Sequence, residues 1–263
     1  MTPSPLIEEG LPLLTRAGGV ATLTLRRPSQ RNSLTDDDLL ALLAHFESMN
    51  ADPSVRVLVL TADTRGQGRP VFSAGYNVAG FNKDPESPQF FERVADALEK
   101  ARPITVCALN GSVYGGATDL VLACDLRVAL RGMEWRMPAC ALGLHYYPSG
   151  LRRYLSRLGL NLSKRAFLLG QSLPYESLDK AELFESLCEA AEFEWAVQAL
   201  TTRLLEMAPL ALQATKQSLN ELAAGEADLQ ALRARGTLTS QSADFAEGRA
   251  AFAERRSPVF QGR

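Results

Sequence analysis

The chain has 263 residues, of which 46% are hydrophobic and 22% charged, the composition of a folded protein with a sizeable core. Its 28 lysines and arginines nearly balance 30 aspartates and glutamates, so the sequence lacks the basic footprint of a nucleic-acid-binding protein. No apolar run approaches the roughly 18 residues that span a bilayer, and residues 1–10 lack a signal-peptide pattern, so we expect neither membrane association nor export.

Cysteine and histidine are scarce. The four cysteines contain no CxxC motif, which indicates reduced thiols and a cytoplasmic protein. The two histidines, His45 and His145, are too few for a typical histidine-based metal site, so we expect no bound metal. His45 is predicted to lie on the exposed side of a helix.

The first half of the chain alternates strand and helix signals. Apolar residues at every second position predict a strand over 20–25, and Thr35 with Asp38 predicts a capping box that opens a helix. Similar signals follow in chain order: strands over 55–61, 104–109 and 125–130, a helix from Ser87, and a short helix ending at Ala123. This alternation predicts an α/β fold with mainly parallel strands.

Helical signals dominate beyond about Pro148, where strand signals fade. Helices are predicted over 150–157, 163–170, 192–207 and 211–224, and residues 244–263 form an amphipathic tail. Pro209 separates two of these helices because proline cannot continue a helix interior. We therefore expect an α/β core followed by a helical C-terminal section.

Two glycine loops follow predicted strands. The pair Gly115-Gly116 precedes the short helix, and Gly75 lies in the loop after the strand over 55–61. The spacing around Gly111 is not GxGxxG, which argues against a nicotinamide cofactor. Either loop alone could be a tight turn that needs glycine for its backbone angles. Together they could aim two backbone N–H groups at one carbonyl oxygen, as an oxyanion hole does.

Several segments resemble the crotonase family, the enoyl-CoA hydratase/isomerase superfamily. They are, in the family's order, residues 25–34 (LRRPSQRNSL), Phe72–Gly75, Ala108–Gly111 with Gly115-Gly116, Ala123–Asp125, Pro138, Leu142-Gly143, Asp244–Gly248 and Phe252–Phe260. The resemblance implies a ββα spiral core over 1–195 that binds acyl-CoA. It also implies a helical C-terminal oligomerisation region over 196–263, which assembles the chain into a homotrimer or a dimer of trimers.

The resemblance also implies a site. The oxyanion donors would be the backbone N–H groups of Tyr76 and Gly116, and the ligand would be a coenzyme A thioester. Residues along the coenzyme A moiety would be Arg27, Arg31, Ser33, Ala74 and Gly75; for the two arginines, an ordinary solvated surface position is the alternative. Coenzyme A would enter as part of the substrate, with no permanently bound cofactor.

The sequence departs from the family's hydratases at their two glutamates. The first is replaced by Asp119, still a carboxylate, and the second by Ala139, which has no acid–base chemistry. The neighbouring His145 and Tyr147 could supply a proton, or the tyrosine rings could simply fill the acyl pocket. Asp119 could also be no more than an acid favoured at a helix N-terminus.

These residues favour an enzyme that stabilises an acyl-CoA enolate, with hydration or double-bond isomerisation of an enoyl-CoA as the leading reactions. The loss of the second glutamate keeps other reactions open. Decarboxylation and thioester hydrolysis need the same oxyanion hole with fewer carboxylates. A coenzyme A-binding protein with little activity is the alternative outside enzymology.

Overall fold

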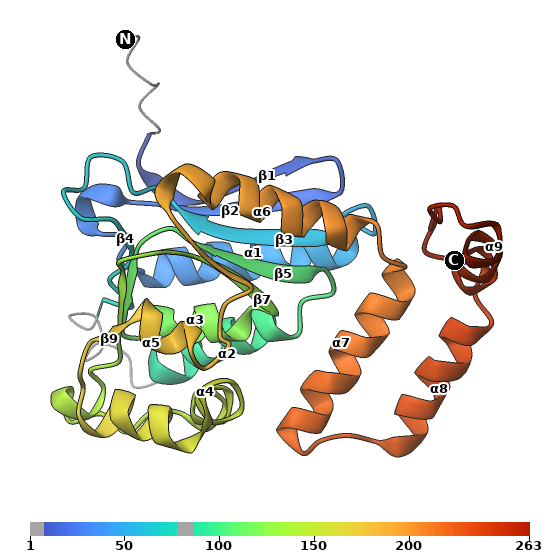
Figure 1. Cartoon of the computed structure of the whole chain (residues 1–263). Helices are drawn as coiled ribbons and strands as arrows, with labels where there is room; N and C mark the ends of the chain where they lie inside the picture. The colour runs from blue at the N-terminus through green and yellow to red at the C-terminus, as the bar shows by residue number, and fades with distance from the viewer. Residues whose placement is uncertain (1–7, 78–86) are drawn as a thin grey trace, which may run out of the picture.

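Two β-sheets form the framework of the protein, and the computed structural model describes residues 8–77 and 87–263 (Figure 1). The larger sheet has the strand order β1 (Gly10–Ala17), β2 (Val20–Arg26), β3 (Val57–Ala62), β5 (Ile104–Leu109), β7 (Leu126–Leu130) and β10 (Ser186–Cys188). The smaller sheet has the order β4 (Val71–Ser73), β6 (Ser112–Tyr114), β8 (Glu134–Arg136) and β9 (Leu173–Pro174). Apart from the antiparallel β1–β2 and β8–β9 pairs, neighbouring strands run parallel.

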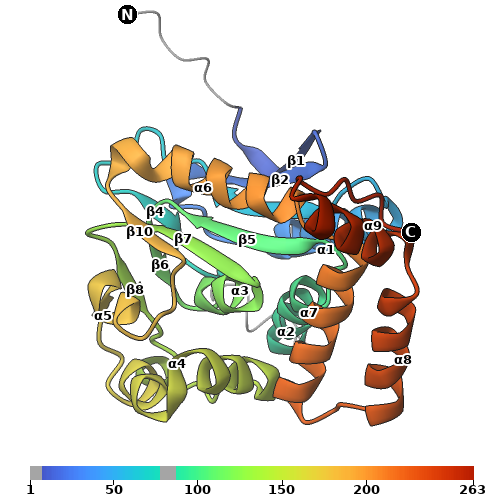
Figure 2. The same ribbon diagram turned by 45° about the vertical axis from the view of Figure 1, so that its right-hand side comes forward.

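Helices cover the larger sheet and continue beyond it. In chain order they are α1 (Asp36–Ala51), α2 (Ser87–Glu99), α3 (Ala117–Ala123), α4 (Pro148–Leu168), α5 (Tyr175–Asp179), α6 (Ala190–Leu205), α7 (Pro209–Ala224), α8 (Leu229–Ser240) and α9 (Ala243–Glu254). Helix α6 lies over one face of the large sheet, and α1, α2 and α3 lie over the other (Figure 1). Helices α7 and α8 form a hairpin beside the core (Figure 2).

The β3 strand shows why the central strands are almost continuously apolar. Val57 and Val59 belong to a small buried cluster with residues of α6, whereas Leu58 and Leu60 face the main core. Successive side chains of a strand point to opposite faces, so a strand covered on both sides needs apolar residues at every position. By contrast β2 buries only alternate residues, with Ala21 facing the main core.

The first half matches the sequence-based predictions closely. The strand predicted over 104–109 is β5, and the strand predicted over 20–25 is β2, which extends one residue further. Thr35 caps α1 through the expected capping box with Asp38. The predicted α/β architecture with mainly parallel strands is therefore confirmed.

The second half differs in three respects. The helices predicted over 150–157 and 163–170 are one element, α4, kinked at Gly159, where φ is 69° and ψ is 170°. The short strands β9 and β10 and the helix α8 were not predicted. Helix α6 packs on the sheet, so the expected boundary between 195 and 196 falls inside an element that belongs to the core.

Helix α7 contacts the core through both apolar and polar side chains, with Leu212 packed against the buried cluster that contains Val57 and Val59. Lys216 of α7 is buried, pairs with Asp125 at 2.7 Å and donates to the carbonyl of Pro103 at 2.9 Å.

Within the described part of the chain, no helix is long and apolar enough to cross a membrane.

Candidate active site

The two glycine loops meet. Gly75 follows β4 and has a φ of 91°, in the region that favours glycine. A Cβ atom on Gly75 would lie 2.6 Å from the carbonyl oxygen of Tyr114 and 3.3 Å from the backbone nitrogen of Gly116. Only a residue without a side chain permits this approach, and it brings the backbone of the Gly75 loop beside the start of α3.

The segment before α1 holds the Gly75 loop in place. The Leu34 amide donates to the Gly75 carbonyl at 2.9 Å, and the Ala74 amide donates to the Arg31 carbonyl at 2.8 Å. Buried Asn32 anchors the segment itself, since its side-chain amide donates to the carbonyls of Asp63 and Val71 at 2.9 and 3.2 Å. Asn32 was not predicted from the sequence; asparagine is one of the few residues that tolerate the left-handed backbone conformation it adopts here, with a φ of 51°.

The backbone N–H group of Tyr76 points in a direction that its neighbours fix. Leu34 donates to the Gly75 carbonyl and accepts from the Asn77 amide at 2.9 Å, so Leu34 and Tyr76 form a parallel bridge. In such a bridge the N–H of the central residue points away from the partner strand. The ring of Tyr76 packs against Phe91 at a centroid distance of 5.9 Å, and the Tyr76 hydroxyl donates to Asp36.

Gly116 begins the short helix α3. It is the N-cap residue, and its carbonyl accepts from the amide of Asp119 at 2.9 Å. A Cβ atom on Gly116 would lie 2.9 Å from the ring of Phe91, so a side chain here would require the Phe91 ring to shift. The first N–H groups of a helix point away from the helix and favour negative charge.

The residues expected to contact coenzyme A lie in different settings. Arg27 pairs with Asp38 at 2.9 Å, whereas Arg31 is exposed. Ala74 is exposed as well, and the Ser33 hydroxyl lies 3.5 Å from the Gly75 carbonyl. Of the two arginines, Arg31 is therefore the one whose side chain is exposed to solvent, whereas Arg27 is paired with Asp38.

Asp119 is completely buried in the first turn of α3. Its two carboxylate oxygens receive a bidentate pair of bonds from Arg153, 2.8 Å from Nε to Oδ1 and 2.6 Å from Nη2 to Oδ2. Oδ2 also accepts from the hydroxyl of Tyr147 at 2.6 Å. The structure thus brings two of the predicted residues together, with Tyr147 as the direct partner of Asp119.

Two stacked tyrosines lie next to this carboxylate. The rings of Tyr146 and Tyr147 are 4.1 Å apart, and the Tyr146 hydroxyl donates to the Tyr147 hydroxyl at 2.9 Å. Burial, and after it the charge of Asp119, raises the pKa of both phenols well above the ordinary value of 10.0. Both tyrosines are therefore neutral hydroxyl groups at physiological pH.

The other predicted positions contribute less. Ala139 is 4% exposed, and its methyl group has no acid–base chemistry. His145 is exposed, in contrast to its neighbour Tyr146. His45 was predicted on the exposed side of a helix; it is instead half-buried on α1, and its Nε2 lies 2.9 Å from the Pro12 carbonyl. Among the described residues, no cluster of His, Cys, Asp and Glu could hold a metal ion.

Arg153 was not predicted from the sequence. Its side chain is fully buried and contacts Asp119, Asp96, Glu99 and Ser149. Burial alone lowers the pKa of this guanidinium, but the bonds to Asp119 and the other carboxylates raise it above its usual value. The helix predicted over 150–157 carries three arginines, and no local pattern marks which of them is buried against acidic partners.

Two loops that meet through glycine backbone, on an α/β framework of mainly parallel strands, define a protein of the crotonase type. The sequence model described as Enoyl-CoA hydratase/isomerase matches residues 15–263. The chain therefore belongs to the enoyl-CoA hydratase/isomerase family, which consists of enzymes acting on coenzyme A thioesters, and the expected family is confirmed.

Relatives cover nearly the full chain. The 2,3-dehydroadipyl-CoA hydratase of Escherichia coli (strain K12) is 30% identical over 264 residues, covering 95% of this chain and 98% of the relative. The 1,2-epoxyphenylacetyl-CoA isomerase of the same organism is 28% identical over 256 residues, covering 93% and 96%. The solved structure of Pseudomonas aeruginosa DspI has a TM-score of 0.86 at 26% identity, covering 98% of this chain and 100% of that one. A family protein from Hyphomonas neptunium reaches 0.87 at 25% identity, covering 96% and 98%.

Proposed function

We propose that this chain isomerises the double bond of an enoyl-CoA by moving a proton between the α- and γ-carbons of the thioester. The observation that carries the proposal is the pairing of Tyr147 with Asp119, one helical turn from Gly116, together with alanine at position 139. A double-bond shift needs one acid–base group that removes a proton and returns it at another carbon.

The charge that develops during this reaction would lie on the thioester oxygen. We place that oxygen between the backbone N–H groups of Tyr76 and Gly116, whose loops meet at Gly75. Each such donor contributes on the order of 3 kcal/mol to the stability of an oxyanion. The coenzyme A moiety would run along Arg31, Ser33 and Ala74, and coenzyme A would be part of the substrate only.

The hydrogen bonds of Tyr147 support a role as the proton acceptor. A phenol oxygen has one proton and two lone pairs. Its proton is directed to Asp119 and one lone pair accepts from Tyr146, which leaves one lone pair for the substrate. When this lone pair takes the α-proton, the phenol proton passes to Oδ2 of Asp119, and the electrons of the broken C–H bond form the dienolate. The reverse transfer delivers a proton to the γ-carbon.

Hydration has less support from the same residues. Adding water requires one group that activates water and another that protonates the α-carbon. Position 139 supplies no such group, so the Tyr147–Asp119 pair would have to serve as both of them. The site thus retains one acid–base pair where a hydratase of this family uses two carboxylates.

One observation favours a second candidate, decarboxylation of a 2-carboxyacyl-CoA. Tyr147 is a neutral phenol whose proton is donated to Asp119, and position 139 has no carboxylate, so the site has a proton donor but only one acid–base group. Decarboxylation needs only a donor: the carbon–carboxylate bond breaks, carbon dioxide leaves, and its electrons form the enolate that the oxyanion hole stabilises. A hydroxyl then protonates the α-carbon and regains its proton from water.

The test is product identification in deuterated water. Purified protein is incubated separately with 3-butenoyl-CoA, crotonyl-CoA and methylmalonyl-CoA, and the thioesters are analysed by mass spectrometry. Isomerisation predicts interconversion of the two enoyl esters with deuterium at the α- and γ-carbons. Formation of a 3-hydroxyacyl-CoA would refute the proposal in favour of hydration, and release of carbon dioxide from methylmalonyl-CoA would establish the second candidate.

We also propose that the C-terminal helices mediate self-association into a homotrimer or a dimer of trimers. Large apolar side chains are exposed on α7, α8 and α9: Leu219, Leu222, Leu229, Leu238, Phe245 and Phe252. Apolar surface of this kind is typical of contacts between chains. Analytical ultracentrifugation tests this directly, and a monomer at micromolar concentration would contradict it.

A further inference from the structure

Arg153 is saturated with hydrogen bonds. A guanidinium has five N–H donors in a fixed plane, and each of them has an acceptor here. Two donate to Asp119 at 2.8 and 2.6 Å, and the others donate to Asp96 at 2.6 Å, Glu99 at 3.1 Å and the Ser149 hydroxyl at 3.2 Å. With no rotational freedom left, the guanidinium fixes the plane and position of the Asp119 carboxylate.

We propose that Arg153 is a positioning residue, which holds Asp119 as a charged acceptor and thereby fixes the direction of the Tyr147 hydroxyl. This inference rests on the proposed function, in which the free lone pair of Tyr147 receives the substrate proton.

The direction of the hydroxyl chain follows from this ion pair. Asp119 is bonded to a cation through both oxygens, so it accepts and Tyr147 must donate to it. Because the Tyr147 proton is already donated to Asp119, the Tyr146 hydroxyl must be the donor in its bond to Tyr147. Released from the guanidinium, the carboxylate could rotate, and the Tyr147 hydroxyl would lose its single orientation.

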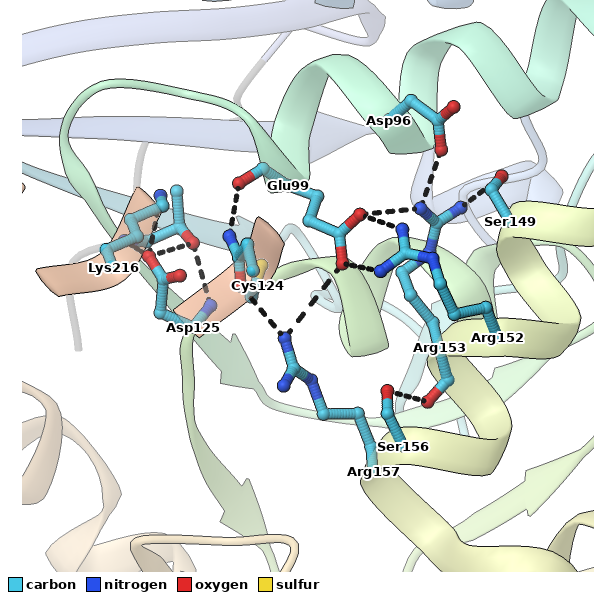
Figure 3. A network of polar contacts seen from close by, with 12 residues as sticks. Asp96, Glu99, Cys124, Asp125, Ser149, Arg152, Arg153, Ser156, Arg157 and Lys216 are labelled. Atoms are coloured by element: carbon cyan, nitrogen blue, oxygen red, sulfur yellow. Dashed lines mark hydrogen bonds and ion pairs between the residues drawn. The ribbon is translucent and has the colours of Figure 1, made fainter. Parts of the chain in front are cut away.

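The surroundings of Arg153 are fixed in turn. Figure 3 shows that Arg152, Arg153 and Arg157 of α4 converge on Glu99 at the end of α2. Ser149 is held by Glu92, whose carboxylate accepts from the Ser149 hydroxyl at 2.9 Å. Arg152 pairs with the same Glu99 but, within the residues that the structure describes, forms no hydrogen bond or ion pair with Asp119.

Two roles of Arg153 can be told apart, because the network also joins α2 to α4. A purely structural role predicts that loss of the guanidinium lowers stability and leaves the reaction step unchanged in the folded protein. A positioning role predicts a lower maximal rate at unchanged ligand affinity. Lysine keeps the charge but has a single nitrogen in place of the planar fork, so Arg153→Lys separates geometry from charge.

The experiment follows exchange of the α-hydrogens of butyryl-CoA in deuterated water, because this saturated ester reports proton transfer whichever reaction the enzyme completes. We expect Arg153→Lys to lower the maximal exchange rate at least tenfold, with half-saturation and Kd within twofold of wild type. Arg152→Lys, the matched control, should change the rate less than twofold. Asp96→Asn weakens one contact of Arg153. Because the Asp96 side chain is 31% exposed, this variant should fold, and we expect it to lower the maximal exchange rate about threefold.

Each outcome is decisive. No deuterium incorporation by wild-type protein into either bound butyryl-CoA or bound 3-butenoyl-CoA refutes the proposed function, and the positioning role with it. If wild type exchanges the α-hydrogens and Arg153→Lys reaches the same maximal exchange rate, the positioning role is overturned while the proposed function stands. If Arg153→Lys does not fold, as judged by circular dichroism, Asp96→Asn decides: an unchanged rate overturns the inference, and a loss confined to the maximal rate supports it.

Discussion

Replacing Gly75 by alanine would push a methyl group against the backbone of the neighbouring loop. The new Cβ atom would lie 2.6 Å from the Tyr114 carbonyl oxygen, about 0.8 Å closer than an ordinary contact of 3.4 Å. Because the obstacle is backbone rather than a flexible side chain, one loop must move. The movement separates Tyr76 from Gly116, whose amides form the proposed oxyanion hole.

The magnitudes follow from two contributions. Alanine at a φ of 91° costs about 1–2 kcal/mol, and overpacking typically adds about 1–3 kcal/mol, so we expect Gly75→Ala to lose about 2–5 kcal/mol of stability. Misplacing one oxyanion donor should lower the catalytic rate about 10²- to 10³-fold.

Gly66→Ala is the matched control. Gly66 has a similar φ of 76°, but a Cβ atom at this position would have no neighbouring atom within 4 Å. The variant should therefore lose only about 1–2 kcal/mol through backbone strain and keep full activity. Stability is measured by urea unfolding and activity by α-hydrogen exchange of butyryl-CoA. A folded Gly75→Ala protein with wild-type exchange would refute the assignment of this loop to the oxyanion hole.

Three further predictions concern the acid–base residues. Tyr147→Phe should lower the exchange rate about 10²- to 10⁴-fold with butyryl-CoA affinity little changed, since the ring can still stack on Tyr146; an unaffected rate would move the chemistry to another residue. Ala139→Glu should produce some 3-hydroxyacyl-CoA from crotonyl-CoA at a lower Tm, because the added carboxylate is buried; no hydration product in the folded variant would count against an otherwise intact hydratase pocket. The pKa of Tyr147 is raised by burial and then by Asp119, so its stabilising contribution is complete below about pH 10 and is lost as pH rises through the folded value. Urea unfolding should therefore show a steeper loss of stability above pH 10 in wild type than in Tyr147→Phe, and parallel curves would contradict this.

Much of the first half of the fold could be predicted because its signals are local. The capping box at Thr35 and the alternation in β2 depend on residues only a few positions apart. The short strands β9 and β10 carry two and three residues, too few for a periodic pattern, and they exist because a neighbouring strand pairs with them. The single helix α4 across Gly159 was missed for a similar reason, since glycine interrupts the local pattern.

The candidate site divides in the same way. Gly75 and Gly116 could be recognised because the order of the motifs placed both loops in one family, and at Gly75 the close approach of the neighbouring backbone requires glycine. Arg153 lies 34 residues from Asp119, and only the packing of α4 against α3 brings them together. No local pattern reveals such a pair, so Asp119 could be predicted from the sequence only without its partner.

The central claim is that two backbone amides polarise the thioester carbonyl of a bound acyl-CoA. Isotope-edited infrared spectroscopy of crotonyl-CoA with a ¹³C-labelled carbonyl measures this directly, because hydrogen bonds to the oxygen weaken the carbonyl bond. We predict a lower carbonyl stretching frequency for the ester bound to wild type than for the free ester in water, and a smaller shift with Gly75→Ala. A bound ester whose carbonyl frequency equals that of the free ester would contradict the account.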